Sequence, residues 1–120
     1  MSGTKIRMID PSIRAIALRR FFMSITVMAH WTAREGREED IERFLAEITE
    51  KSLAEPGCLA YRSFRSLENG REFALFEEYS DADALAHHKA SAHYRELVLE
   101  RVVPLLVKRH VGRYGTLRAV

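Results

Sequence analysis

The chain has little cysteine, proline and glycine, and it has no long hydrophobic run. Its 120 residues include three prolines, six glycines and a single cysteine, Cys58. One cysteine cannot form a disulfide within the chain, which favours a reducing compartment. No apolar stretch approaches the roughly 20 residues of a membrane helix, and Ala15–Leu18 is too short for a signal-peptide core. We therefore expect a soluble, cytoplasmic protein without a membrane partner.

An excess of charge of one sign is also absent. The chain has 19 basic and 17 acidic side chains, which gives a net charge of +2. Residues 1–22 carry five of the basic and one of the acidic side chains, so residues 23–120 keep 14 basic and 16 acidic ones. A body without a basic excess argues against a nucleic-acid partner. The length suits one domain, and we expect a basic extension over 1–22 and a folded domain over 23–120.

Two stretches predict the first strand and the first helix. Residues Ser24–Ala33 are rich in β-branched and aromatic side chains, which is typical of a strand. We expect a helix from about Glu38 that ends before Pro56, because proline disfavours helical geometry in the residue that precedes it. Its apolar residues recur with the spacing of one buried face, at Ile41, Phe44, Leu45, Ile48 and Leu53.

A hairpin and two helices are predicted next. Cys58–Ser66 and Glu72–Ser80 have the composition of strands, and Asn69-Gly70 lies between them. Asn-Gly is typical of tight hairpin turns with positive φ angles, so the two strands should pair antiparallel. Asp81 and Ser91 then have the side chains of helix N-caps, for a short helix to about residue 89 and a longer one to about residue 107.

The remaining elements complete an α+β fold. Pro104 lies inside the second helical pattern and should bend or end it, and Lys108–Arg118 is the predicted last strand. The order β-α-β-β-α-β predicts a ferredoxin-like fold, with an antiparallel four-stranded sheet and helices on one face. Phe64 and Phe76 have the strand parity of the uncovered face. An apolar uncovered face needs a second cover, so we expect a homodimer.

Four short motifs are spread along the chain between Met23 and about Leu117. They are Ala33-Arg34-Glu35-Gly36, Glu55-Pro56-Gly57-Cys58-Leu59-Ala60-Tyr61, Phe73-Ala74-Leu75-Phe76-Glu77-Glu78-Tyr79, and Ala84-Leu85 followed by His88, Ser91, His93 and Tyr94. Together they resemble the antibiotic biosynthesis monooxygenase domains, and within them the small quinol-monooxygenase-like proteins. The resemblance implies a dimeric α+β barrel with a ligand chamber between sheet and helices. The resemblance also implies that some relatives add oxygen to phenols, anthrones or quinols without metal or flavin.

His88 is the candidate catalytic residue. It follows Leu85 by three positions, about 60° around a helix, so both should face the core, whereas His87 should face solvent. A neutral imidazole in the chamber is suited to take a proton from a phenol or quinol. The alternative is a core histidine held by a carbonyl or by Glu77. No ligand lies at i+4 from His88, so we expect no metal.

Five further residues are candidate substrate contacts. Trp31 and Tyr79 offer flat surfaces for an aromatic ring, and Tyr61 offers a hydroxyl. Glu77 alternates with apolar residues on its strand, so it should orient His88 or pair with an arginine such as Arg62. The fifth candidate is His93, two residues after the predicted cap Ser91. The alternative is that His93 braces the junction between the two helices.

These features favour a monooxygenase that needs no cofactor. We expect it to oxidise an electron-rich aromatic, such as a quinol, an anthrone or a polyketide-like phenol, with molecular oxygen. Haem binding or degradation, a non-enzymatic small-molecule-binding dimer, and an isomerase or lyase acting on a sugar-derived ketone are the alternatives. Fold alone does not choose among them.

Overall fold

The computed structural model describes residues 24–117, so the predicted extension over 1–22 lies outside the described residues. Strands and helices follow the predicted order. They are β1 (Ile25–Ala33), α3 (Glu38–Leu53), β2 (Cys58–Arg65), β3 (Glu72–Tyr79), α4 (Ala82–Ala90), the wide helical segment η1 (Tyr94–Val102), the short 3₁₀ turn η2 (Val103–Leu105) and β4 (Leu106–Gly115).

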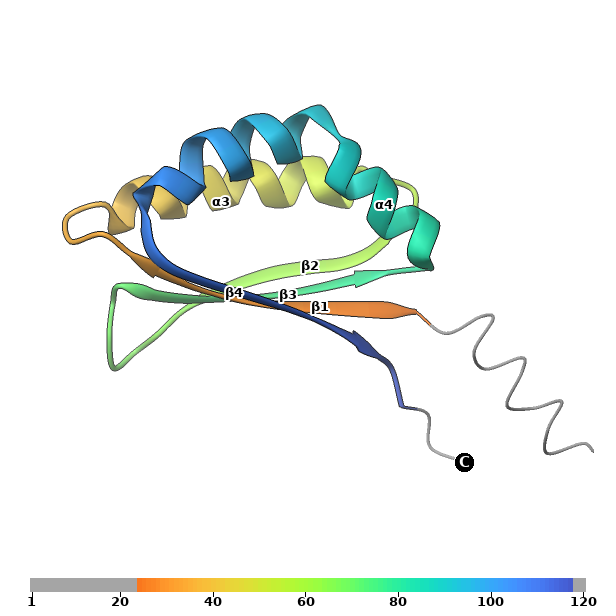
Figure 1. Ribbon diagram of the computed structural model, residues 1–120, viewed down its shortest axis with the longest axis horizontal. Coiled ribbons are helices and arrows are strands. Elements are labelled where there is room, and N and C mark those ends of the chain that lie inside the picture. The colour runs from red at the N-terminus through yellow and green to blue at the C-terminus, as the bar shows by residue number, and fades with distance from the viewer. Residues whose placement is uncertain (1–23, 118–120) are drawn as a thin grey trace, which may run out of the picture.

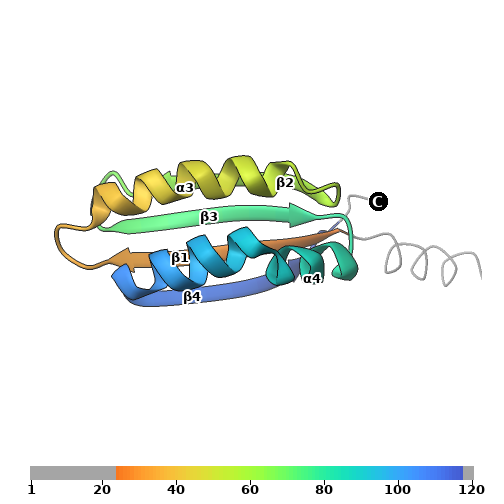
Figure 2. The same cartoon turned by 90° about the horizontal axis from the view of Figure 1, so that it is seen from above.

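The four strands form one antiparallel sheet in the order β2-β3-β1-β4. The helices of residues 24–117 lie on the same side of this sheet, and no element of these residues covers the other side (Figure 1). Seen from above, α3 covers the half that contains β2 and β3, while α4 and η1 run above the other half (Figure 2). The predicted ferredoxin-like fold is thereby confirmed.

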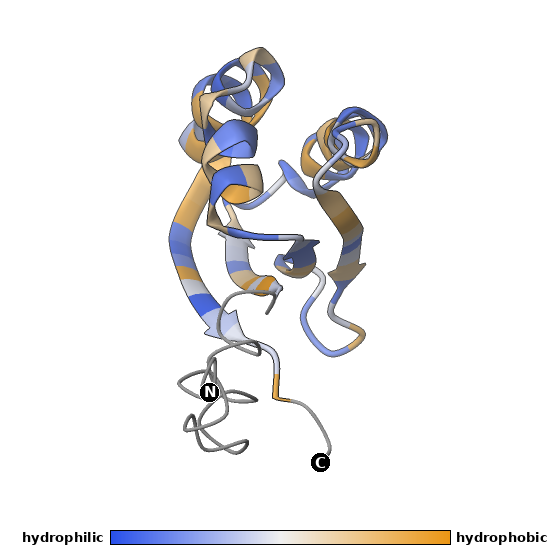
Figure 3. Cartoon of the chain, turned by 90° about the vertical axis from the view of Figure 1, so that its right-hand side faces the viewer, coloured by the Kyte–Doolittle hydropathy of each residue, from blue (hydrophilic) through white to orange (hydrophobic). Residues whose placement is uncertain are grey.

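Side chains alternate between the two faces of the sheet. In β1 the residues Val27, Ala29 and Trp31 are buried under the helices, whereas Met28 and His30 are exposed on the other face. Figure 3 shows that hydrophilic and hydrophobic residues occur in turn along the strands. This period of two is what a sheet with one covered face requires.

The open face of the sheet carries apolar side chains, as its parity predicts. Met28, Phe64 and Tyr114 are 40%, 45% and 49% exposed there. His30 of β1 lies directly opposite His110 of β4 on this face. A second copy of the chain as its cover stays a prediction.

The hairpin between β2 and β3 pairs antiparallel as predicted, but its turn is different. Within the described residues only Gly36 has a positive φ angle, so Asn69-Gly70 does not form the expected tight turn. The connection is longer instead, because the Ser66 hydroxyl accepts hydrogen bonds from the Glu68 and Asn69 amides at 3.1 and 3.0 Å. Local hydrogen bonds of this kind stabilise a turn that needs no residue with a positive φ angle.

The second helical region ends earlier than its sequence predicts. The segment η1 ends with the Val103 amide donating to the carbonyl of Val98, five residues back, which is the wide π-type register. Pro104 then closes the helix in the turn η2, and β4 begins at Leu106 rather than at residue 108. None of the helices described here combines the length and the apolar character that crossing a membrane would require.

Candidate active site

His88 lies in the last turn of α4, on the face that packs against the sheet. The Asp81 carboxylate caps this helix by accepting a hydrogen bond from the Ala84 amide at 2.8 Å. Leu85 and His88, three residues apart, are both buried, while His87 is exposed. The predicted orientation of these two histidines is therefore confirmed.

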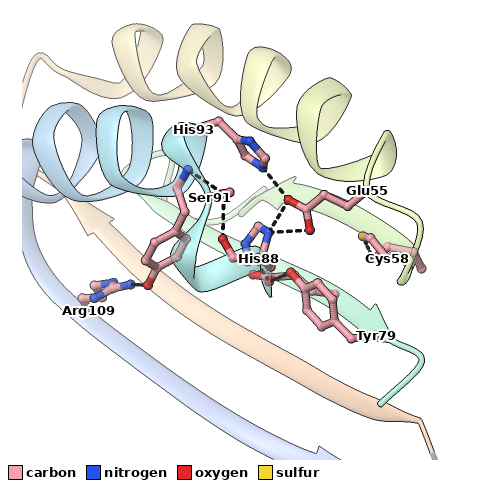
Figure 4. A network of polar contacts seen from close by, with 10 residues as sticks. Glu55, Cys58, Tyr79, His88, Ser91, His93 and Arg109 are labelled. Carbon is pink, nitrogen blue, oxygen red and sulfur yellow. Dashed lines mark hydrogen bonds and ion pairs between the residues drawn. The ribbon is translucent and has the colours of Figure 1, made fainter. Parts of the chain in front are cut away.

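A buried carboxylate joins His88 to His93. Oε2 of Glu55 lies 3.0 Å from Nδ1 of His88 and 2.5 Å from Nε2 of His93 (Figure 4). Glu55 follows the end of α3, His88 belongs to α4, and His93 precedes η1. One carboxylate thus holds three segments of the chain together, because both imidazoles lie within hydrogen-bonding distance of it.

Sequence reasoning gave Glu55 no role, although it lies in one of the motifs that carry the family resemblance. A glutamate beside Pro56-Gly57, just after a helix, has the pattern of a solvated loop. In the structure Glu55 is buried, with 9% of its surface exposed. Its partner His88 lies 33 residues away in the sequence. The pairing is long-range, so no local spacing contains it.

Burial keeps His88 neutral. Desolvation lowers the pKa of His88 below its ordinary value of 6.5, and the hydrogen bond and charge of Glu55 oppose this shift. If Nδ1 donates its proton to Glu55, the lone pair remains on Nε2. Nε2 lies 4.0 Å from a carboxylate oxygen of Glu77. The ring is thus a neutral base with one nitrogen anchored.

Of the two partners that the sequence suggested for Glu77, His88 lies beside it and Arg62 does not. The Tyr79 hydroxyl donates to its Oε1 at 2.6 Å, whereas Arg62 lies on the opposite face of the sheet with its guanidinium over the ring of Phe64. The pairing with Arg62 is therefore wrong, because the two side chains alternate to different faces. Burial raises the pKa of Glu77 to about 7, although the Tyr79 hydrogen bond and the charge of Arg109 lower it.

A cavity of about 150 Å³ lies between the sheet and the helices α4 and η1. Apolar and aromatic residues form most of its wall, and four of the predicted site residues line it: Trp31, Tyr61, Glu77 and His88. The indole Nε1 of Trp31 is buried and has no hydrogen-bond partner among the described residues. A buried donor without an acceptor is rare in folded proteins, and a bound oxygen atom is one way to satisfy it.

Tyr79 and His93 do not line this cavity. Tyr79 is fully buried behind Glu77, with its ring centroid 5.1 Å from that of His88. His93 lines a separate surface groove with Lys51 and Glu96, on the far side of Glu55. Their position makes them supports of Glu77 and Glu55, so the bracing alternative for His93 fits its contacts.

Glu55 and the two histidines that contact it are candidate metal ligands. Glu55, His88 and His93 each place one ligand-type atom within 4.8 Å of the others. The sequence argument considered only i+4 spacing along one helix, so it overlooked ligands from three segments. Both imidazoles approach the same carboxylate oxygen, however, and the three groups already satisfy one another by hydrogen bonding.

A model of one protein family matches residues 24–98, which hold β1, the α3–β2–β3 core, α4 and the start of η1. This family is described as antibiotic biosynthesis monooxygenase.

The chain belongs to the antibiotic biosynthesis monooxygenase family.

Relatives of known sequence and structure agree with this assignment. The chain is 31% identical over 70 residues to "Putative monooxygenase Rv0793" of Mycobacterium tuberculosis, which covers 58% of this chain and 68% of that protein. The solved structure of Rv0793 superimposes with a TM-score of 0.74 at 28% identity, over 80% of this chain and 97% of the other. The structure of PA3566 from Pseudomonas aeruginosa gives 0.73 at 29% identity, over 80% and 96%. The predicted family and the monooxygenase type of enzyme are thereby confirmed.

Proposed function

We propose that this protein is a cofactor-independent monooxygenase that oxidises a quinol or a related phenol with molecular oxygen. The observation that carries the proposal is the environment of His88. The imidazole is 2% exposed, a buried carboxylate anchors one of its nitrogens, and the ring forms part of the wall of an apolar cavity. This is the arrangement of a base held in one orientation beside a bound ligand.

The first step is removal of a proton from the ring hydroxyl of the substrate. Nε2 of neutral His88 accepts this proton, and Glu55 stabilises the resulting imidazolium through Nδ1–H. Without the carboxylate, a charged imidazole at this depth would be costly because burial disfavours the charged form. Glu55 therefore acts as a positioning residue that also carries the balancing charge.

Trp31 supplies a hydrogen bond to the oxygen of the deprotonated ring. Its Nε1–H is buried in the cavity wall and has no partner among the described residues. A substrate oxygen can therefore accept a hydrogen bond from it without breaking another one. A ring bound between the apolar walls would displace water from this indole, and the lower local dielectric would strengthen the hydrogen bond.

The second step is electron transfer from the anion to oxygen. The anion gives one electron to O₂, and the two radicals combine into a carbon–oxygen bond. His88 returns its proton to the peroxide, which then loses water, with the hydrogen of the attacked ring carbon, to form a quinone. One oxygen atom ends on the ring and the other in water, and the substrate supplies all four electrons. A quinol thus becomes a hydroxyquinone, and no external reductant enters the balance.

The size of the cavity favours small rings. A cavity of about 150 Å³ suits one aromatic ring, since an engineered protein cavity of roughly that volume binds benzene. A three-ring anthrone extends beyond this space, and a tetrapyrrole is larger still. Quinols of one or two rings are therefore favoured over anthrones, and haem is disfavoured.

Oxygen uptake tests the proposal. The purified protein is mixed with a panel of hydroquinones under ¹⁸O₂, once with and once without a metal chelator. The products are analysed by mass spectrometry. We expect uptake above the rate without protein and one ¹⁸O atom in the quinone product. Tight binding of a quinol without any uptake would instead indicate a non-enzymatic binding protein. Uptake that the chelator abolishes would indicate a metal held by Glu55, His88 and His93.

A further inference from the structure

Three cationic side chains surround the exposed side of the cavity. Lys89 of α4 and Arg109 and Arg113 of β4 are all lining residues, and all three are exposed. Arg109 lies opposite Trp31 and Arg113 opposite Val27 in the sheet, so both belong to the face that the helices cover. The cavity therefore has an apolar interior and a basic rim built from two different elements.

The basic rim has no ion-pairing carboxylate in the described part of the chain, although the charge of Arg109 lowers the pKa of Glu77. None of the three cations forms an ion pair with a carboxylate in residues 24–117. The lining residues include one carboxyl group, Glu77, which is buried and already accepts a hydrogen bond from Tyr79. By contrast, Arg37, Arg43 and Arg65 on α3 and β2 each find an acidic partner. A cleft lined by charge of one sign concentrates ligands of the opposite sign.

One of the cations is also fixed in place. A guanidinium nitrogen of Arg109 donates to the Tyr94 hydroxyl at 3.1 Å, so its side chain is held against η1 beside the cavity (Figure 4). Guanidinium groups bind carboxylates through paired hydrogen bonds, and an ordered guanidinium loses less entropy on binding.

We infer that the substrate is an aromatic acid, whose oxidisable ring occupies the apolar interior while its carboxylate binds the rim formed by Lys89, Arg109 and Arg113. This inference rests on the proposed function, because it takes the cavity beside His88 as the substrate site. It adds the anionic group, which the oxidation itself does not require.

Calorimetric titration with two matched probes tests the inference. The probes are 2,5-dihydroxybenzoate, a quinol with a carboxylate, and its uncharged methyl ester, both titrated under argon so that no oxidation occurs. We expect the acid to bind about tenfold more tightly than the ester at low salt, as one charged hydrogen-bonding contact allows. This preference should shrink as salt is added, because the rim is exposed.

Variants of the rim locate the effect. In Lys89→Gln, Arg113→Gln and the double variant, the ratio of acid to ester affinity should fall several-fold. Arg62→Gln is the matched control, since Arg62 lies on the open face of the sheet, and its ratio should equal that of the wild type.

Equal affinities for acid and ester, an unchanged ratio in the rim variants, or no binding of the acid would each overturn the inference. Oxygen uptake with unsubstituted hydroquinone separates the two proposals. If uptake occurs but the acid has no advantage, the inference fails and the proposed function stands. If the acid is preferred but no quinol is oxidised, the anion site stands and the proposed function fails.

Discussion

Glu55 accepts contacts from two imidazoles at a single carboxylate oxygen, and this restricts what each imidazole does. The nitrogen of His88 that faces Glu55 is committed, so the other nitrogen is the one available for proton transfer. His93 contacts the same oxygen from the side of the surface groove, which places it behind the carboxylate rather than beside the cavity. The three residues thus form a chain of proton-carrying groups from the cavity wall to the surface.

Replacement of His88 should separate catalysis from stability. We expect His88→Gln to lower kcat by about 10²- to 10⁴-fold, the usual contribution of a positioned acid or base. His87→Gln is the matched control, because the neighbouring His87 is exposed, and it should retain wild-type activity. Oxygen uptake and thermal unfolding of both variants are the measurements. Equal losses of activity and stability in His88→Gln would assign His88 a structural role.

The pH dependence of activity should identify Glu55 as the positioning residue. The pKa of His88 lies below 6.5, so protonation of His88 should lower kcat/KM only in solution more acidic than that. Because Glu55 raises the pKa of His88, Glu55→Gln should move this acidic fall to still lower pH and also reduce turnover. Glu50→Gln, on the exposed side of α3, is the control. An acidic limb that stays in place in Glu55→Gln would contradict the assignment.

Glu77 should make the folded state less stable as the pH rises. Its pKa is about 7 in the folded protein against an ordinary 4.5, so the native state holds a proton that the unfolded chain has lost between these values. The free energy of unfolding should therefore decrease from pH 4.5 to 7, by roughly 3 kcal/mol from this group. Glu77→Gln should remove most of this decrease, whereas Glu72→Gln, exposed on the same strand, should not. Urea unfolding at several pH values is the measurement.

At the scale of elements, the residue before β2, Gly57, packs closely against α4. A methyl group added at Gly57 would overlap the side chain of Ala84 on α4. We expect Gly57→Ala to lower the free energy of unfolding by about 1–3 kcal/mol and to reduce activity, because the displaced helix carries His88 away from Glu55. Gly70→Ala is the control, since the nearest atoms there belong to the flexible end of Arg65. Similar stabilities of the two variants would show that α4 tolerates the displacement.

The elements themselves were largely predictable from sequence, and the departures from prediction have local causes. Apolar spacing predicted α3, β-branched and aromatic composition predicted the strands, and the distance of three residues from Leu85 predicted that His88 faces inward. The Asn69-Gly70 turn differed because the Ser66 hydroxyl bonds the loop amides instead. Glu55 was missed because its burial depends on α4 and η1 folding over the end of α3, a long-range contact that local patterns do not contain.

At the scale of the whole molecule, the open face of the sheet predicts self-association. We expect a homodimer in analytical ultracentrifugation, because Met28, Phe64 and Tyr114 expose apolar surface there. Phe64→Glu should convert the dimer to monomer, since a buried unpaired carboxylate is costly. Leu53→Glu is the control, because Leu53 is similarly exposed but lies on α3. A monomeric wild type, or a dimer that Phe64→Glu leaves intact, would contradict the expectation.

Trp31 is the only tryptophan of the chain, and it lies in the wall of the cavity. Its ultraviolet emission therefore arises entirely from the place where a ligand would sit. A guest that hydrogen-bonds the indole should shift the emission maximum, and an electron-poor quinone should quench it. Filling and emptying of the chamber can thus be followed by fluorescence in real time, without any attached dye.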